Sequence, residues 1–167
     1  MSILQGSSEV VDRIHELVQR TNQLNFSSNR YQQEEVGRIF ENPDLDSFCI
    51  KCVDKFGTYG TVGFCIVDNK RPEMIDLMFS CRVQSKRVEH AFIGWLLHRY
   101  KDAGFDKLTA VYKKTPKNTP GGKVFTELGF IERSAENNIF LYEFDFANEI
   151  PWDGLVAVEY EGEAWEP

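Results

Sequence analysis

The hydrophobic pattern of the chain changes period several times, and the order of these changes is the strongest constraint on its fold. Apolar residues recur at helical spacing up to about Thr21 and again over residues 32–41, where Asn42-Pro43 ends the second helix. The pattern then alternates over residues 47–55 and 61–68, and the glycine-containing segment between them predicts a hairpin. The chain therefore begins with two helices and continues into a sheet.

The rest of the pattern completes an alternation of strands and helices. We expect strands at residues 73–83, 108–112 and 138–146, and helices at residues 88–103, ending before Gly104, and at residues 124–128. This order predicts an α/β or α+β domain whose sheet is largely antiparallel, with one β-α-β crossover. The 167 residues suffice for one domain, which we place at residues 1–147. Residues 148–167 form an acidic C-terminal extension that either adds a strand or frays.

Charge is distributed very unevenly along the chain. The formal net charge is −7, but residues 134–167 contain nine acidic residues and no Lys or Arg. Residues 82–117 instead contain nine basic residues against three acidic ones. A basic middle followed by an acidic end favours a phosphorylated small molecule or an acidic protein as partner over a nucleic acid, although solvated charged faces would give the same pattern.

Cysteine usage and the N-terminus indicate a reducing, cytoplasmic setting. All four cysteines lie in apolar, strand-like surroundings, and the first residues lack the basic and apolar regions of a signal peptide. No apolar run approaches the ~20 residues of a membrane helix. Cys49 and Cys52 spell C-x-x-C, but no second pair or nearby histidine accompanies them, so we expect no metal site.

Two segments carry a resemblance to the GNAT acyltransferases, a family with a mixed, mostly antiparallel sheet flanked by helices. The family's Q/R-x-x-G-x-G/A turn, which holds the pyrophosphate of acyl-coenzyme A at a helix N-terminus, corresponds to residues 84–89, where Arg87 and Glu89 fill both glycine positions. Asn118, Gly121, Phe125 and Gly129-Phe130 match a later N-x-x-A-x-x-x-Y-x-x-x-G-F pattern. Phenylalanine replaces its tyrosine and cannot protonate a leaving thiolate.

Further motifs resemble the C-terminal, GNAT-like region of FkbH-type proteins over about residues 13–130. These motifs include T-N-Q-L-N at residues 21–25 and S-C-R-V at residues 80–83. The resemblance implies acyl or glyceryl transfer to the phosphopantetheine thiol of an acyl carrier protein, with a carrier-bound thioester or acyl-CoA as cofactor. FkbH-type proteins also carry an upstream HAD-like phosphatase half with a D-x-D-x-T/V motif. Asp44-Leu45-Asp46 has only its first letters and lies, we expect, in a loop, so that half is a possible separate partner.

Cys81 is our candidate nucleophile, because Arg82, Lys86 and Arg87 follow it closely and cations stabilise a thiolate. A buried structural cysteine is the alternative. His90 is either its base or, as we consider more typical, an exposed histidine. Asn118 either polarises a thioester carbonyl or caps the next helix. The remaining candidates follow the resemblance: Arg82, Val83, Ser85, Lys86, Arg87 and Val88 for the cofactor, and Thr21, Asn22 and Asn25 for the substrate.

The asparagines and the threonine of this last group have an alternative role in satisfying backbone groups at a helix end. Two other functions also fit the sequence. One is an acetyl-CoA-dependent N-acetyltransferase, which the filled glycine positions and Phe125 disfavour. The other is a non-catalytic module that docks a carrier or another protein.

Overall fold

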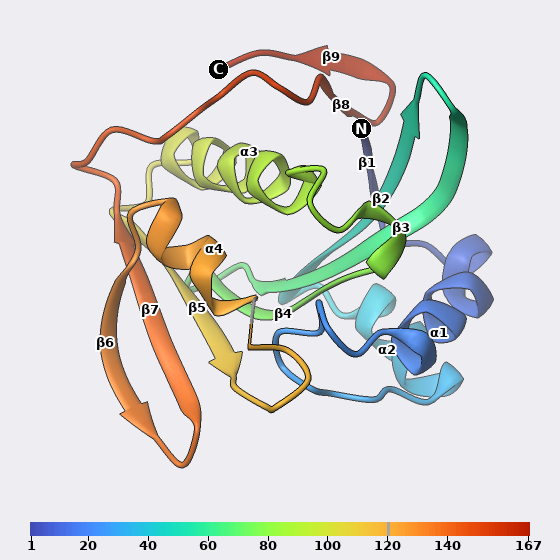
Figure 1. The fold of residues 1–167 in the computed structure, drawn as a ribbon, viewed down its shortest axis with the longest axis horizontal. Helices are drawn as coiled ribbons and strands as arrows, with labels where there is room; N and C mark the ends of the chain where they lie inside the picture. The colour runs from blue at the N-terminus through green and yellow to red at the C-terminus, as the bar shows by residue number, and fades with distance from the viewer. Residues whose placement is uncertain (120) are drawn as a thin grey trace.

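The structure, a computed structural model, describes residues 1–119 and 121–167 (Figure 1). Its first half contains β1 (Ser2–Gln5), α1 (Val11–Arg20), α2 (Gln33–Glu41), β2 (Leu45–Asp54), β3 (Gly57–Asp68) and β4 (Glu73–Phe79). Its second half contains α3 (Val88–Asp102), β5 (Lys107–Lys113), α4 (Gly122–Glu127), β6 (Ile131–Glu136), β7 (Ile139–Asp145), β8 (Val158–Tyr160) and β9 (Glu163–Trp165). Short 3-10 turns precede α1 at Ser8–Val10 and follow β4 at Cys81–Val83.

The strands form one sheet in the order β6-β7-β5-β4-β3-β2-β1-β8-β9. Neighbouring strands are antiparallel except for β4 with β5 and β1 with β8. The single expected crossover is present, because α3 connects the parallel strands β4 and β5. The predicted α/β fold with a mixed, mostly antiparallel sheet is confirmed.

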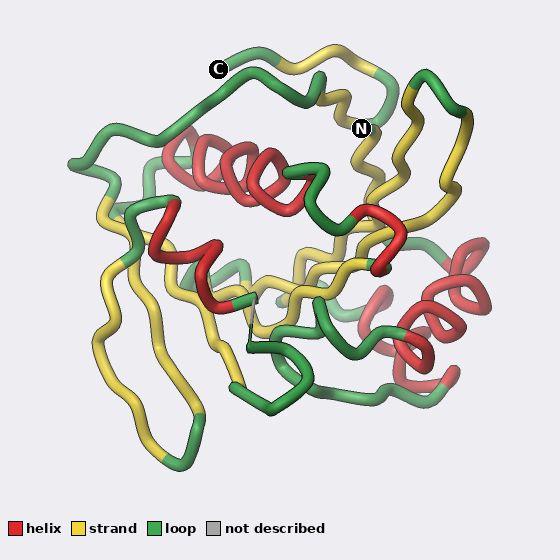
Figure 2. The backbone as a smooth tube through the Cα atoms, viewed as in Figure 1, coloured by secondary structure: helices red, strands yellow, loops and turns green. Residues whose placement is uncertain are grey.

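The helices lie on both faces of the sheet (Figure 2). On one face α1 and α2 bury Ile14, Val18 and Val36 against Phe64 and Met78 of the sheet. On the other face α3 and α4 cover a larger aromatic core, in which Phe48 meets Trp95 at 5.2 Å between ring centroids and Phe125 stacks on Tyr142 at 5.0 Å. Burial of these apolar side chains removes their surface from water, which stabilises the packing of the helices on the sheet by about 25 cal/mol per Å² of apolar surface.

Strands β4 and β5 separate after a short common stretch, and another segment of the chain fills the gap. They pair only at Glu73 with Thr109 and at Met74 with Ala110. Residues 24–26 then lie beside β4, where Phe26 N donates to Leu77 O at 2.9 Å and Phe79 N donates to Leu24 O at 2.9 Å. Lys113 N of β5 donates to Phe26 O at 2.8 Å. The segment thereby satisfies backbone groups that the separating strands would leave unpaired.

The expected third strand is shorter than its sequence pattern suggests. Strand β4 ends at Phe79, and Cys81–Val83 form a 3-10 turn instead of continuing the strand to residue 83. Ser80 begins the turn, and its hydroxyl accepts hydrogen bonds from Arg82 N at 3.4 Å and Arg82 Nε at 3.2 Å. A serine at such a position competes with strand hydrogen bonding.

The acidic C-terminal extension packs against the rest of the fold. From Phe146 onward the chain crosses α3 and supplies β8, which pairs in parallel with β1, and β9 (Figure 1). Trp165 contacts His98 of α3 at 5.4 Å and Trp152 at 5.0 Å between ring centroids. Of the two alternatives for residues 148–167, added strands rather than a frayed end are observed.

Candidate functional site

A cavity of about 330 Å³ lies where α1 and the loop after it meet the end of β4. It is lined by Arg13, Glu16, Leu17, Arg20, Thr21, Asn22, Gln23, Thr61, Ser80, Cys81 and Arg82. Four of the residues that the sequence suggested therefore share one cavity: Thr21 and Asn22 from the T-N-Q-L-N segment, and Cys81 and Arg82 from S-C-R-V. The two motifs meet because residues 24–26 pair with β4 directly before the Cys81 turn.

Cys81 is the exposed cysteine of the chain, whereas Cys49, Cys52 and Cys65 are buried. Burial raises the pKa of Cys49 to about 12 and raises the pKa of Cys65 well above its ordinary value. A hydrogen bond from Ser80 N to Val62 O, 2.7 Å long, fixes the backbone that presents Cys81 to the cavity. The alternative of a thiol enclosed in the core is thus excluded for Cys81.

Three guanidinium groups make the cavity positive. Arg13 and Arg20 both pair with Glu16, the latter at 2.7 Å, so one carboxylate balances two cations. Arg82 donates to Ser80 Oγ and, at 3.4 Å, to Thr61 O. Because the arginines outnumber the single acid, the cavity favours an anionic ligand. The sequence did not identify Arg13 and Arg20 as site residues, because an arginine on an amphipathic helix is most often simply exposed to solvent.

The predicted substrate-binding residues differ in availability. Thr21 is buried and donates its hydroxyl proton to Leu17 O at 2.8 Å, which satisfies the end of α1. Asn22 is exposed and accepts a hydrogen bond from Arg30 at 2.7 Å. Asn25 is buried: its oxygen accepts from Ser28 N at 2.7 Å and its amide donates to the Asn29 carbonyl at 3.0 Å. Asn22 alone of these three keeps an exposed polar side chain at the cavity.

Asn118 holds two segments together and is not free to act on a substrate. Its amide donates both protons, to Asn25 O at 2.7 Å and to Lys113 O at 2.8 Å. Its oxygen accepts from Thr115 N at 2.7 Å, and the residue is 1% exposed. Both N–H donors are used, so polarising a thioester carbonyl would require breaking a buried bond. The alternative of a helix cap is also not observed, because α4 begins after Gly121.

The turn before α3 has the backbone geometry of a glycine-rich turn without its glycines. Ser85 and Arg87 have φ angles of 64° and 58°, in the left-handed region that favours glycine. Val83 and Val88 point their side chains into the core. Lys86 Nζ lies 2.9 Å from Asp54 Oδ2, and Arg87 Nε lies 2.5 Å from Asp153 Oδ2. Two of the three cations expected to meet phosphate, Lys86 and Arg87, thus pair with carboxylates of this chain.

His90 does not line the Cys81 cavity, and our expectation of an exposed side chain is wrong. It is 8% exposed and lines a different cavity, between α3, α4 and the C-terminal segment. Its Nε2 lies 2.7 Å from Glu127 Oε2, and its Nδ1 lies 3.6 Å from Glu89 Oε1. The carboxylates of Glu89 and Glu127 raise the pKa of His90 against the opposing effect of burial.

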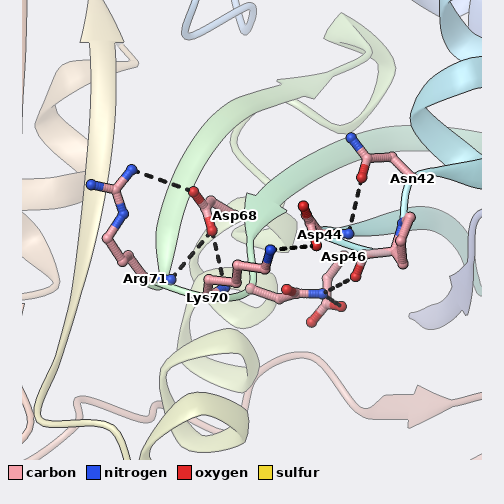
Figure 3. A network of polar contacts seen from close by, with 8 residues as sticks. Asn42, Asp44, Asp46, Asp68, Lys70 and Arg71 are labelled. Atoms are coloured by element: carbon pink, nitrogen blue, oxygen red, sulfur yellow. Dashed lines mark hydrogen bonds and ion pairs between the residues drawn. The ribbon is translucent and has the colours of Figure 1, made fainter.

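Asp44 and Asp46 belong to a polar network at the other end of β2 (Figure 3). Asp44 pairs with Lys70 at 2.8 Å, while Asp46 accepts from Asn69 at 3.1 Å and from the Tyr100 hydroxyl at 2.7 Å. The expectation that this segment is a loop is wrong for Leu45 and Asp46, which lie in β2. Both carboxylates thus contact the turn between β3 and β4, Asp44 through Lys70 and Asp46 through Asn69.

The described residues contain neither a metal-ligand cluster nor a membrane-spanning helix. No group of three or more His, Cys, Asp and Glu side chains is placed to hold a metal ion within residues 1–119 and 121–167. Among the helices of this part of the chain, none has the length and apolar character needed to cross a membrane.

Comparison with known proteins identifies the fold. The sequence matches no protein-family model and no curated protein. A domain from Methanocaldococcus jannaschii DSM 2661 superposes with a TM-score of 0.70 at 19% identity, covering 86% of this chain and 97% of that one. The ribosomal-protein-S18-alanine N-acetyltransferase from Escherichia coli gives 0.65 at 11% identity, covering 91% and 95%. The GNAT domain of S. lividans PAT gives 0.65 at 15% identity, covering 86% and 89%.

These similarities show a single class of fold. The chain has a GNAT-like fold, with its sheet flanked by helices on both faces as in the acetyltransferases it resembles. TM-scores of 0.65 to 0.70 show the fold, and at identities of 11% to 19% they show the fold alone, so the reaction is argued from the site.

Proposed function

We propose that this protein is a thiol-dependent acyltransferase in which Cys81 carries the acyl group. The observation that supports this proposal most is the positive cavity that brings the exposed Cys81 together with Asn22 and with the guanidinium groups of Arg13, Arg20 and Arg82. A reachable thiol beside cations is the setting in which a cysteine forms covalent intermediates.

The reaction would proceed in two balanced steps. The Cys81 thiolate attacks the carbonyl carbon of an activated acyl donor, an S–C bond forms, and the bond to the donor's leaving group breaks. The acceptor, the phosphopantetheine thiolate of an acyl carrier protein, then attacks the new thioester and releases the Cys81 thiolate. Both bonds in the second step are thioesters of similar energy, so this exchange needs no further activation.

The turn before α3 favours carrier-bound phosphopantetheine over free coenzyme A, because its cations and its glycine positions are already occupied. Asp54 and Asp153 already neutralise Lys86 and Arg87. Side chains occupy both glycine positions of the turn, and Glu89 adds a carboxylate there. The pyrophosphate of coenzyme A would have to displace these contacts, whereas an arm held by its own carrier protein need not bind at this turn.

The resemblance to FkbH-type proteins supports the choice of acceptor. It suggests a glyceryl or related hydroxyacyl group, and a separate HAD-like phosphatase as the partner that prepares or dephosphorylates the donor. Arginines lining the Cys81 cavity suit a donor that carries a phosphate or carboxylate.

Mass spectrometry of the intact protein tests this function. After incubation with an acyl phosphate or acyl thioester, we expect a mass increment of one acyl group that maps to Cys81. A holo-acyl carrier protein should remove it. Cys81→Ser should carry no increment, whereas Cys49→Ser should behave as the wild type. An increment that persists in Cys81→Ser would overturn the proposed role.

The structural similarities favour a second candidate, an acetyl-CoA-dependent N-acetyltransferase. Phe125 is buried in the aromatic core and has no proton to donate to a leaving thiolate, so this reaction would need another acid. Calorimetric titration with acetyl-CoA distinguishes the two candidates. Micromolar binding that depends on Arg87 would favour the N-acetyltransferase, and acylation of Cys81 would favour the first proposal.

A further inference from the structure

Exposed apolar side chains gather at the tip of the β2–β3 hairpin and on the neighbouring C-terminal segment. Val53 is 63% exposed, Phe56 is 80% exposed and Leu155 is 71% exposed. Val53 and Leu155 line the same groove of about 490 Å³, which Lys86 also lines. Within the described residues the two other exposed large apolar side chains, Ile131 and Ile139, belong to the distant β6–β7 hairpin. Large exposed apolar side chains mark interaction sites more often when they form a cluster than when they are isolated.

The same region is positively charged, although the chain as a whole is acidic. Around the hairpin, the groove and the Cys81 cavity, six basic side chains face three acidic ones: Arg13, Arg20, Lys51, Lys55, Arg82 and Lys86 against Glu16, Asp54 and Glu159. Lys55 Nζ lies 5.0 Å from the centre of the Phe56 ring. An apolar tip surrounded by cations complements an acidic protein surface that has an apolar patch.

The hairpin also connects this surface to the nucleophile. Arg82 donates to Thr61 O of β3 at 3.4 Å, and Lys86 pairs with Asp54 of β2. The cavity that holds Cys81 and the groove that holds Leu155 therefore lie on either side of one hairpin. A protein bound at the tip would place a flexible arm within reach of Cys81.

We propose that the hairpin-tip surface, made of Val53, Lys55, Phe56, Lys86 and Leu155, is the docking site for the acidic carrier protein. This inference rests on the proposed function and adds the surface through which the carrier binds. Phe56 acts as the central apolar anchor, and Lys55 pairs with a carboxylate of the carrier, while the positive charge of the surrounding side chains accelerates its association.

Disulfide exchange tests the docking surface without knowledge of the acyl donor. The probe is a bacterial holo-acyl carrier protein whose pantetheine thiol is converted to a 2-pyridyl disulfide. The Cys81 thiolate attacks the pantetheine sulfur, a new S–S bond forms, the old one breaks, and pyridine-2-thione leaves after taking up a proton. Its absorbance gives the rate, and the 2-pyridyl disulfide of free pantetheine measures the reactivity of Cys81 without docking.

The wild-type protein should react at least about tenfold faster with the carrier than with free pantetheine disulfide. Lys55→Glu and Phe56→Ser should each lower the carrier rate about fivefold or more, with the small-molecule rate unchanged. Lys101→Glu and Ile139→Ser, the matched controls far from the hairpin, should change neither rate. High salt should lower the ratio of the rate with the carrier to the rate with free pantetheine disulfide.

The possible failures are distinguishable. If the small disulfide does not react, or reacts equally with Cys81→Ser, the proposed function itself is wrong. If the small disulfide reacts at Cys81 but Lys55→Glu and Phe56→Ser match their controls with the carrier, the docking proposal alone is overturned. A change in oligomeric state on Phe56→Ser, measured by sedimentation, would also overturn it by assigning the surface to a second copy of the chain.

Discussion

Arg87, which precedes α3, and Asp153, in the C-terminal segment, are joined by a contact of 2.5 Å between Nε and Oδ2. The carboxylate also accepts a hydrogen bond from Leu155 N at 3.0 Å. Against the effect of burial, these two bonds lower the pKa of Asp153. An anion supplied by the chain thus lies beside a cation of the turn that was predicted from the sequence to hold a phosphate.

The backbone at Arg87 makes this position sensitive to residue type. Its φ of 58° costs an L-residue roughly 1 kcal/mol that glycine does not incur. We expect Arg87→Gly to be about 1 kcal/mol more stable than Arg87→Ala, although alanine is the better helix former. Both variants lose the pair with Asp153, so the comparison isolates the backbone. Urea unfolding measures the difference, and an alanine variant of equal or higher stability would contradict it.

The cysteines provide a direct check of the site. In the folded protein we expect one thiol to react rapidly with a thiol reagent such as dithionitrobenzoate, because Cys81 is exposed and the other three are buried. All four should react after unfolding in guanidinium. Cys81→Ser should abolish the rapid phase, while Cys52→Ser should leave it intact. Two rapid thiols in the native protein would show that the strand cysteines are accessible.

Motifs in the sequence predicted much of the fold and part of the site. Residues 21–25 and 80–83 were singled out by resemblance, and the structure brings Thr21, Asn22, Cys81 and Arg82 together in one cavity. The alternating and helical periods also gave the order of most elements. Strands β1, β6 and β9 were missed, because β1 has four residues, β9 has three and β6 is exposed throughout, so none of them leaves a hydrophobic pattern.

Long-range pairing explains the remaining differences. The sequence around Lys86 and Arg87 suggests free cations, because their partners Asp54 and Asp153 come from other parts of the chain. Asn118 has a sequence position compatible with catalysis, but its partner Asn25 fixes it in a structural role. Such contacts depend on how elements pack in three dimensions, which local spacing does not encode.

The buried carboxylate of Asp76 should be essential for the stability of the loop at residues 27–31, which follows the cavity-lining residues 21–23. It is fully buried and accepts hydrogen bonds from Ser27 Oγ at 2.6 Å, Tyr31 Oη at 2.7 Å and Asn29 Nδ2 at 3.1 Å. Asp76→Ala leaves these donors unpaired, so we expect a loss of about 3 kcal/mol in the free energy of unfolding. Asp44→Ala, which removes an exposed pair with Lys70, should cost less than about 1 kcal/mol. Urea unfolding of both variants measures the contrast, and equal losses would show that the network does not anchor the loop.

His90 should make stability depend on pH near neutrality. The carboxylates of Glu89 and Glu127 raise the pKa of His90 in the folded protein above its ordinary value of 6.5. Below the unfolded-state pKa, histidine is protonated in both states, and the folded protein gains the full interaction with the two acids. As pH rises through the higher folded-state pKa, the proton is lost and the stabilisation disappears.

We therefore expect the free energy of unfolding to fall as pH is raised from about 6 to about 8. His90→Gln should remove most of this dependence, whereas His15→Gln, on the partly exposed face of α1, should retain it. Urea unfolding across this range measures the dependence, and NMR titration of the imidazole should show a midpoint above 6.5. If the midpoint lies below 6.5, or if stability rises over this interval and does so equally in His90→Gln, the ion-pair description of His90 is wrong.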